Sequence, residues 1–343
     1  MKTPPGLGLL LLLGLLALAF GANVATGSIH IPILDIFSIL LGRSTDNPAW
    51  ASVILKLRLP QAVTATLAGA ALAVSGLQMQ TLFRNPLAGP FVLGISSGAS
   101  LGVALVVLSA GAGGATLSGW SGNLGHVVAG IGGASAVLVI VLLTARRVPT
   151  LTLLILGVLF GYAASAMVSI LLRFSSAESV QSYVIWTLGE FSGVSWSQLT
   201  LLAPLLVVGL GIAGASVKPL NALLLGEAYA RSMGVSVGRV RIWLIASTAL
   251  LAGAVTAFCG PIGFLGIAVP HLARSLFQSS DHRVLMPRVI LLGAILALVA
   301  DLLAQVPGSS QVLPLNAITA LLGTPVVIWV IVGRPSLKDS FSR

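Results

Sequence analysis

The chain has 343 residues, of which 57% are hydrophobic and only 8% are charged. Soluble domains have about a quarter of their residues charged, so this composition excludes a soluble globular protein and predicts an all-α, polytopic membrane protein. The formal net charge of +10 does not indicate nucleic acid, because the basic residues are scattered between apolar segments rather than gathered in one patch. The single cysteine excludes an intrachain disulfide.

Apolar segments of spanning length recur along the whole chain, and a membrane-spanning helix needs about 20 mainly apolar residues. We expect ten such helices in one transmembrane domain over residues 1–343, namely Leu7–Val24, Ala62–Phe83, Phe91–Ala110, Leu124–Ala145, Leu151–Leu172, Leu199–Val217, Ile242–Phe258, Gly260–Phe277, Val289–Gln305 and Ala317–Val332. The first fits both a cleaved signal peptide and a retained helix. The eighth opens on Gly260-Pro261 and contains Pro270, which favours a broken or re-entrant helix.

The basic residues indicate how the chain is oriented in the membrane. With the N-terminus in the cytoplasm, only four of the 18 basic residues fall outside, namely Arg43, Lys56, Arg58 and Arg173. Cytoplasmic loops carry an excess of lysine and arginine. The pattern therefore predicts a multi-pass protein with both termini cytoplasmic.

A polar break separates the second and third predicted helices and contains Asn85 and Pro86. Irregular backbone at membrane depth persists only where protein or a water-filled cavity covers it. The pattern of Gly89–Ser96 recurs with one insertion in Gly260–Ala268. This recurrence favours inverted repeats, whose interrupted segments border a substrate route, although glycine and proline also recur by chance in glycine-rich membrane helices.

The chain lacks the lysine pattern of a nucleotide-binding loop. A P-loop requires lysine directly after glycine, and none of the four lysines of this chain follows a glycine. Uphill transport would therefore need either a coupled ion or a separate ATPase subunit. The two possibilities are an ion-coupled secondary transporter with inverted repeats and the permease subunit of an ATP-driven importer.

Several motifs resemble the signature of the FecCD-type permeases, the membrane subunits of ABC importers for ferric siderophores, haem and cobalamin. They are Arg58-Leu59-Pro60, Arg84–Ala88, Leu93–Ala99, Pro270-His271 and Ala300-Asp301-Leu302. The resemblance implies the inverted-repeat fold of the cobalamin importers, a retained first helix and alternating access in a bacterial cytoplasmic (inner) membrane. It leaves open which of the three ligands is carried.

The same resemblance implies a set of partners. They are a second, identical permease subunit, two ATPase subunits that bind ATP and Mg²⁺, and an extracytoplasmic substrate-binding protein. This chain would then be a transport subunit in the lipid bilayer, not an enzyme, with no cofactor of its own and no nucleic-acid partner.

Candidate site residues follow from the resemblance and from their positions. Residues 221–241 form a cytoplasmic segment similar to a coupling helix that enters an ATPase, with Gly226, Glu227, Ala228, Arg231 and Gly234 as its motif. Arg58, Lys56 and Arg43 are expected to dock the binding protein. Ser165, Ser169 and Thr319 are expected to line the route, on the fifth and tenth helices. The structural motif comprises Asn85, Pro86, Gly94, Pro270, His271, Arg274 and Asp301.

Two of these motif residues raise the possibility of metal or proton chemistry. His271 and His282 lack a clustered carboxylate or thiol, so we expect no metal site. Asp301 lies within a predicted helix, where a carboxylate costs about 2.5–3.5 kcal/mol unless it has a partner or faces water. We expect a packing role for Asp301, with proton coupling as the alternative.

Overall fold

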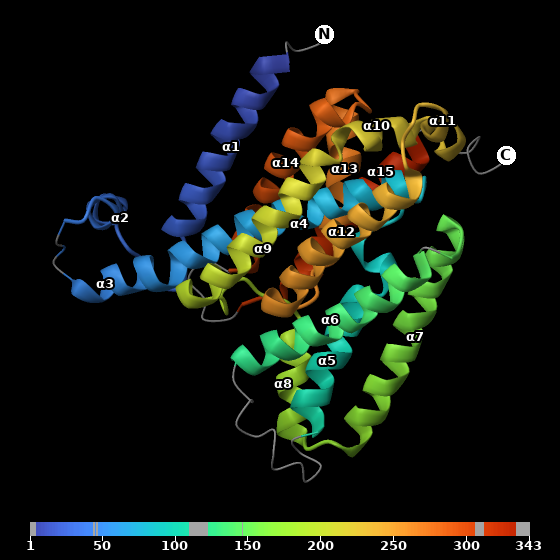
Figure 1. Ribbon diagram of the computed structural model, residues 1–343. Helices are drawn as coiled ribbons and strands as arrows, with labels where there is room; N and C mark the ends of the chain where they lie inside the picture. The colour runs from blue at the N-terminus through green and yellow to red at the C-terminus, as the bar shows by residue number, and fades with distance from the viewer. Residues whose placement is uncertain are drawn as a thin grey trace.

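The computed structural model describes residues 5–43, 45, 47–109, 123–145, 147–305 and 312–333. In these ranges the chain is helical (Figure 1), with no named strand and one isolated bridge between Gln305 and Val312. The helices are α1 (Pro5–Ala25), α2 (Ile33–Leu40), α3 (Pro48–Val53), η1 (Ile54–Arg58), α4 (Leu59–Leu82), η2 (Pro90–Leu93), α5 (Ile95–Ser109), α6 (Asn123–Ala145), α7 (Thr150–Phe174), α8 (Ala177–Thr187), α9 (Trp196–Ala215), α10 (Val217–Leu224), α11 (Glu227–Ser232), α12 (Val237–Cys259), α13 (Leu265–Phe277), α14 (His282–Ala304) and α15 (Leu315–Gly333).

The ten predicted spans all correspond to apolar helices. Seven helices are long and apolar enough to cross a membrane, and one of them is the continuous run Pro48–Leu82. The shorter apolar helices α5, α13 and α15 complete the ten. The predicted eighth span is broken, because α13 begins only at Leu265, after irregular backbone. The predicted end of the third span, Ala110, lies outside the described residues.

Helices α4 and α12 form the centre of the protein, since most of their side chains are buried. Small residues allow this close packing. A Cβ on Gly76 of α4 would overlap the carbonyl group of Gly266 in α13, and a Cβ on Gly69 would overlap that of Gly293 in α14. In contrast, only about a fifth of the residues of α1, α6 and α7 are buried within this chain, as in helices that contact lipid or another subunit.

The packing of the helices follows the internal repeat expected from the sequence. Helix α4 packs along α14 as α12 packs along α6, and α5 contacts α7 as α13 contacts α15. Helices α4 and α12 also contact each other. These contacts match if α4, α5, α6 and α7 correspond, in this order, to α12, α13, α14 and α15. The two Gly-Pro breaks precede the corresponding helices α5 and α13. The recurrence of Gly-Pro in the sequence therefore marks equivalent positions in the fold.

The short helices outside the bundle lie at its two ends (Figure 1). Helices α10 and α11 lie at the end where α1 begins and α15 finishes, which we call the α11 end. Helices α2 and α3 lie near the opposite end of α1, which we call the α2 end. The candidate coupling and docking residues are thus separated by the length of the bundle.

Candidate functional site

At the α11 end, α10 and α11 form a compact pair of short helices. Helix α11 ends at Ser232, and two residues later Gly234 has a φ of +82°. The Gly234 N–H donates to the carbonyl of Arg231 at 3.0 Å, and the Val235 N–H donates to that of Ala230 at 3.0 Å. This pair of hydrogen bonds is the Schellman motif, which requires a residue that tolerates positive φ. Gly234 therefore caps the C-terminus of α11.

The outer face of this helix pair is apolar and exposed. We define the coupling surface as Leu224, Leu225, Ala228, Tyr229 and Met233, all of them exposed. Arg231 is also exposed, and its Nη2 donates to Glu227 Oε2 at 2.9 Å, one turn earlier in α11. Exposed apolar side chains on a short helix suit a groove on a partner protein.

Beneath the coupling surface, Glu227 connects α11 to the rest of the bundle. Its Oε1 accepts hydrogen bonds from Thr150 Oγ1 at 2.7 Å and from Arg241 Nη2 at 3.2 Å. The Nη1 of Arg241 also donates to the carbonyls of Ala145 (3.3 Å) and Val148 (3.0 Å). Glu227 and Arg241 therefore fix α11 to α12 and to the connection between α6 and α7.

Asn221 in α10 provides a second connection. Its Nδ2 donates to Asp281 Oδ1 at 2.6 Å, and its Oδ1 accepts from the backbone N–H of His282 at 2.8 Å. The His282 Nε2 lies 2.9 Å from the hydroxyl of Thr81 at the end of α4. The Arg283 N–H and then the Asn221 amide, both bonded to the carboxylate, lower the pKa of Asp281. This connection leads to the buried helices α4 and α14.

The polar break between α4 and α5 is held in place by α13. Asn85 Oδ1 accepts the N–H of Leu87 at 2.9 Å, which closes a tight turn. The carbonyl oxygen of Pro86 lies 2.6 Å from His271 Nε2. The motif residues Asn85, Pro86 and His271, far apart in the sequence, therefore meet at one site.

Arg274 makes a similar contact one turn after His271. Its Nη1 donates to Gln80 Oε1 at 2.7 Å, and the Nε2 of the same glutamine donates to the carbonyl of Ile267 at 3.2 Å. Pro270 lies inside α13 between these contacts. These residues join α13 to the end of α4, which is a structural role. Among the described residues, no group of three histidines, cysteines or acids could hold a metal.

The three residues expected to line the route lie in different environments. Ser165 and Ser169 lie on the exposed face of α7, beside Tyr162, which is 72% exposed. Thr319 instead is buried and donates its hydroxyl to the carbonyl of Asn316 at 3.1 Å. It lines a mainly apolar cavity of about 190 Å³ between α13, α14 and α15. Thr319 therefore faces the interior of this chain, in contrast to the two serines.

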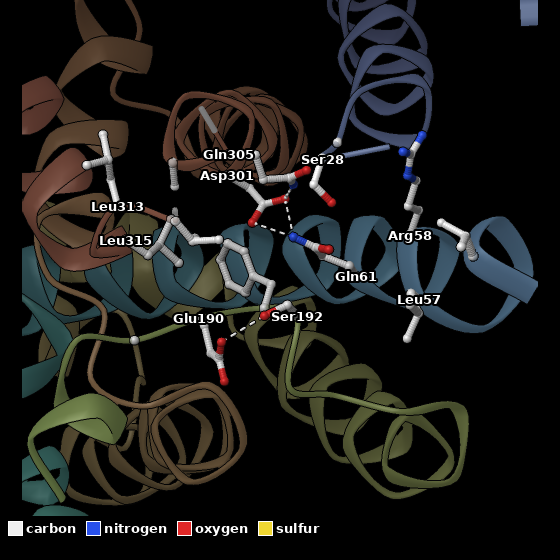
Figure 2. Close-up of a pocket in the computed structure, with 16 residues that line it drawn as sticks. Ser28, Leu57, Arg58, Gln61, Glu190, Ser192, Asp301, Gln305, Leu313 and Leu315 are labelled. Carbon is white, nitrogen blue, oxygen red and sulfur yellow. Dashed lines mark hydrogen bonds between the residues drawn. The ribbon is translucent and has the colours of Figure 1, made fainter. Parts of the chain in front are cut away.

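Asp301 lies at the α2 end in a cluster of carboxamides (Figure 2). Its oxygens accept hydrogen bonds from Asn23 Nδ2 (2.8 Å), Gln61 Nε2 (3.0 Å to each oxygen) and Gln305 Nε2 (2.8 Å). Asp301 is almost completely buried. A buried carboxylate needs such donors, and here they join α1 and α4 to α14. This geometry fits the packing role expected for Asp301.

Beside this cluster is an open cavity of about 320 Å³, bordered also by Glu190 (Figure 2). Glu190 Oε2 accepts a hydrogen bond from Ser192 Oγ at 2.7 Å. The side chain of Glu190 points away from Asp301 in this view. The cavity therefore has acidic groups on two sides, in separate hydrogen-bonding arrangements.

Arg58 differs from the exposed docking position expected from the sequence. Its side chain is buried, and its Nη1 donates to the carbonyls of Val24 (3.2 Å) and Ala25 (3.0 Å). These carbonyls end α1, so the guanidinium caps that helix and also offsets its negative end. Lys56 and Arg43 are exposed at the same end, as docking would require.

Sequence reasoning gave no role to several residues that organise these sites. Thr150 and Arg241 belong to no motif, and their importance depends on contacts with Glu227, which is remote in sequence from Thr150. Asn23 carried a usable signal, because polar side chains within apolar spans require partners. Gln61 did not, because it precedes the predicted span Ala62–Phe83. Only the fold identifies Asp301 as that partner.

Comparison with known proteins agrees with this architecture. The model of the FecCD transport family matches residues 12–333. The vitamin B12 import system permease protein BtuC of Citrobacter koseri is 41% identical over 280 residues, covering 81% of this chain and 82% of that protein. The BtuC protein of Salmonella paratyphi A is 38% identical over 312 residues, covering 89% of this chain and 93% of the relative.

A solved structure has the same fold. It is described as an inward-facing conformation of a metal-chelate type ABC transporter, and it matches with a TM-score of 0.82 at 28% identity. The match covers 95% of this chain and 99% of that one. With a family model over nearly the whole chain and relatives near 40% identity, the chain belongs to the FecCD transport family and is a permease subunit of an ABC importer.

Proposed function

We propose that two copies of this chain form the membrane channel of a bacterial inner-membrane importer. Each copy binds one ATPase subunit, which holds ATP and Mg²⁺, and the pair receives cargo from one extracytoplasmic binding protein. The α11 end faces the cytoplasm and the α2 end faces outward. ATP binding closes the ATPase pair, and the channel then alternates between outward and inward access.

The observation that carries this proposal is the coupling surface. Leu225, Tyr229 and Met233 are 62%, 53% and 57% exposed, yet they lie on helices that are fixed underneath by Glu227 and Asn221. Apolar groups held in place but uncovered fit a partner groove better than they fit water. An ATPase subunit that covers this surface would move α10 and α11 as a unit.

The cargo that we propose is a corrinoid such as vitamin B12. Two relatives with printed functions are vitamin B12 permeases, and they cover most of this chain. The exposed face of α7 is mainly apolar, with Ser165 and Ser169 as its small polar groups. A second copy that faces this surface would enclose a route with few strong binding groups, which suits a large ligand that must be released.

The test is uptake in a strain from which the gene for this chain has been deleted. Labelled cyanocobalamin, labelled haem and a labelled ferric siderophore are supplied in parallel, with and without the gene restored. We expect cyanocobalamin uptake to disappear and return, and to be abolished by an inactive partner ATPase. If deletion abolishes uptake of haem or of the ferric siderophore but leaves cyanocobalamin uptake unchanged, the corrinoid assignment is wrong. Uptake driven by an ion gradient in liposomes that contain only this chain would overturn the importer assignment.

A further inference from the structure

Helix α7 is held differently from the central helices of the bundle. It packs mainly against α5, η2 and α6, and most of its 25 residues face outward. Leu151, Tyr162 and Phe174 are 68%, 72% and 75% exposed along its length. Near its end, Val168, Leu171 and Leu172 pack with α5 and α8 around Tyr183. A helix held along one side can tilt together with these neighbours without disrupting α4 and α12.

The first residue of α7 is attached directly to the first residue of α11. Thr150 donates its hydroxyl to Glu227 Oε1 at 2.7 Å, and Arg241 Nη2 donates to the same oxygen at 3.2 Å. Arg241 also binds the carbonyls of Ala145 and Val148, on both sides of the turn that leads into α7. We call Thr150, Glu227 and Arg241 the α7 clamp.

A second contact fixes α7 further along its length. Gly94, which has a φ of +74°, lies against the backbone of α7. A Cβ at Gly94 would be only 2.8 Å from the carbonyl oxygen of Gly157. A Cβ on Gly157 would overlap the carbonyl oxygen of Val92 in η2. Two backbones in direct contact, without side chains between them, form a narrow point of support. Such a contact can act as a pivot for a helix that packs along one side only, where Val168, Leu171 and Leu172 lie against α5 and α8.

We infer that the α7 clamp transmits movement of α10 and α11 to α7, which tilts about the contact between Gly94 and Gly157. Glu227, Arg241 and Thr150 are thus positioning residues for transport. The inference rests on the proposed function, since an ATPase must move the coupling surface. From Thr150 to Gly157 is about 10 Å along the helix, and from Gly157 to Phe174 about 26 Å, at 1.5 Å per residue. A small displacement at the clamp therefore becomes a larger, opposite displacement at the far end.

The second connection of α10 does not have this geometry. Asn221 leads through His282 to Thr81, and both α4 and α14 are buried along most of their length. Central helices packed through backbone contacts resist displacement. Asn221 therefore anchors the coupling segment to α4 and α14, and Arg241 anchors it to α12. Thr150 instead connects it to α7, which packs along one side only.

The experiment measures movement of α7 in the assembled transporter. Cys259 is the single cysteine of the chain, so a Cys259→Ser background leaves no native thiol in the permease subunits. The permease is labelled before the ATPase subunits are added. Phe174→Cys then places one spin label at the far end of α7 in each permease subunit. Pulsed electron paramagnetic resonance gives the distance between the two labels with and without ATP and vanadate. Co-purification of the ATPase subunit and its ATP hydrolysis are measured on the same samples.

Three variants are compared in this background. Arg241→Gln removes the ion pair of the clamp, and Thr150→Val removes the hydroxyl with little change in shape. Arg239→Gln is the matched control, because Arg239 is exposed and donates to Ser236 outside the clamp. We expect Thr150→Val, which leaves the bond between Arg241 and Glu227 in place, to bind the ATPase and hydrolyse ATP like the control. The label distance of Arg241→Gln is compared only in samples in which the ATPase subunit is bound. The nucleotide-dependent change in label distance should fall to less than half of the control value.

The outcomes distinguish failure of the α7 clamp inference from failure of the proposed function. A control-sized change in distance in both clamp variants would overturn the inference and leave the proposed function standing. If Arg241→Gln does not assemble, Thr150→Val decides alone. A parent chain that binds no ATPase subunit would overturn the proposed function, and the inference with it.

Discussion

Asn23 in α1 donates its side-chain amide to Asp301 in α14 at 2.8 Å, across a separation of 278 residues. Gln61 of α4 donates to the same carboxylate, so one buried acid joins three helices. The first helix of the chain exposes much of its surface and packs mainly against α14. Its position therefore depends strongly on this polar contact.

Asp301→Ala should loosen α1 and lower the thermal stability of the purified protein. The substitution leaves buried amide donors unpaired, at a cost of about 1.5–3 kcal/mol for hydrogen bonds to a charged group. The measurement is the apparent melting temperature by fluorescence-detected size exclusion. Asp35→Ala, on the short helix α2, is the control and should show little change. An unchanged melting temperature for Asp301→Ala would contradict the anchoring role.

Asp301→Asn tests the alternative of proton coupling. The amide keeps one oxygen that can accept hydrogen bonds, but it cannot exchange a proton between two charge states near neutral pH. If Asp301 serves packing, the dependence of uptake on external pH should match that of the parent protein. A loss of that pH dependence with folding retained would show that Asp301 takes part in proton coupling.

Arg231→Glu should abolish uptake while leaving the fold intact. Arg231 is exposed at 63%, and its pair with Glu227 is of the i,i+4 type, which contributes only about 0.3–0.5 kcal/mol to stability. Beside the coupling surface, however, a reversed charge opposes the partner, and we expect ATPase binding to weaken at least about tenfold. Binding is measured by titrating the ATPase subunit onto immobilised permease. Arg239→Glu provides the charge-matched control, and normal uptake by Arg231→Glu would exclude the docking role.

Gly76→Ala should destabilise the protein strongly. The added Cβ would overlap the carbonyl group of Gly266, where backbone rather than a movable side chain opposes it. Overpacking of this kind costs about 1–3 kcal/mol. Gly14→Ala in α1 is the matched control, because no atom lies within 4 Å of its added Cβ. Equal yields and melting temperatures for the two variants would contradict the close packing of α4 against α13.

Lys56→Glu should change the affinity for the binding protein, whereas Arg58→Gln should change the stability of the fold. Lys56 is exposed, so reversing its charge should lower the affinity for the binding protein by up to about fivefold, as expected for the loss of an exposed ion pair. Arg58 caps α1, so its substitution should lower the melting temperature and leave the affinity of the folded protein unchanged. Affinity is measured by surface plasmon resonance at two salt concentrations. A stable Arg58→Gln protein with weakened binding would return Arg58 to the docking surface.

Hydropathy and motif order determined much of this protein from its sequence. Ten apolar segments predicted ten helices because a helix in lipid must be long and apolar to satisfy its backbone. The repeated Gly-Pro break indicated the internal repeat that the packing of α4–α7 and α12–α15 then displays. The cap at Gly234 is also a local feature, because it requires only a residue that tolerates positive φ. These features depend on residues close together in the chain.

The roles of individual polar side chains were decided only by the tertiary structure. Arg58 and Lys56 are two residues apart, yet one is buried against the end of α1 and the other is exposed. Thr319 faces an interior cavity although its helix was expected to line the route. Burial depends on which helices meet at a given point, and those helices come from distant parts of the sequence. Thr150, Glu227 and Arg241 therefore became one site only when the folded chain brought α7, α11 and α12 together.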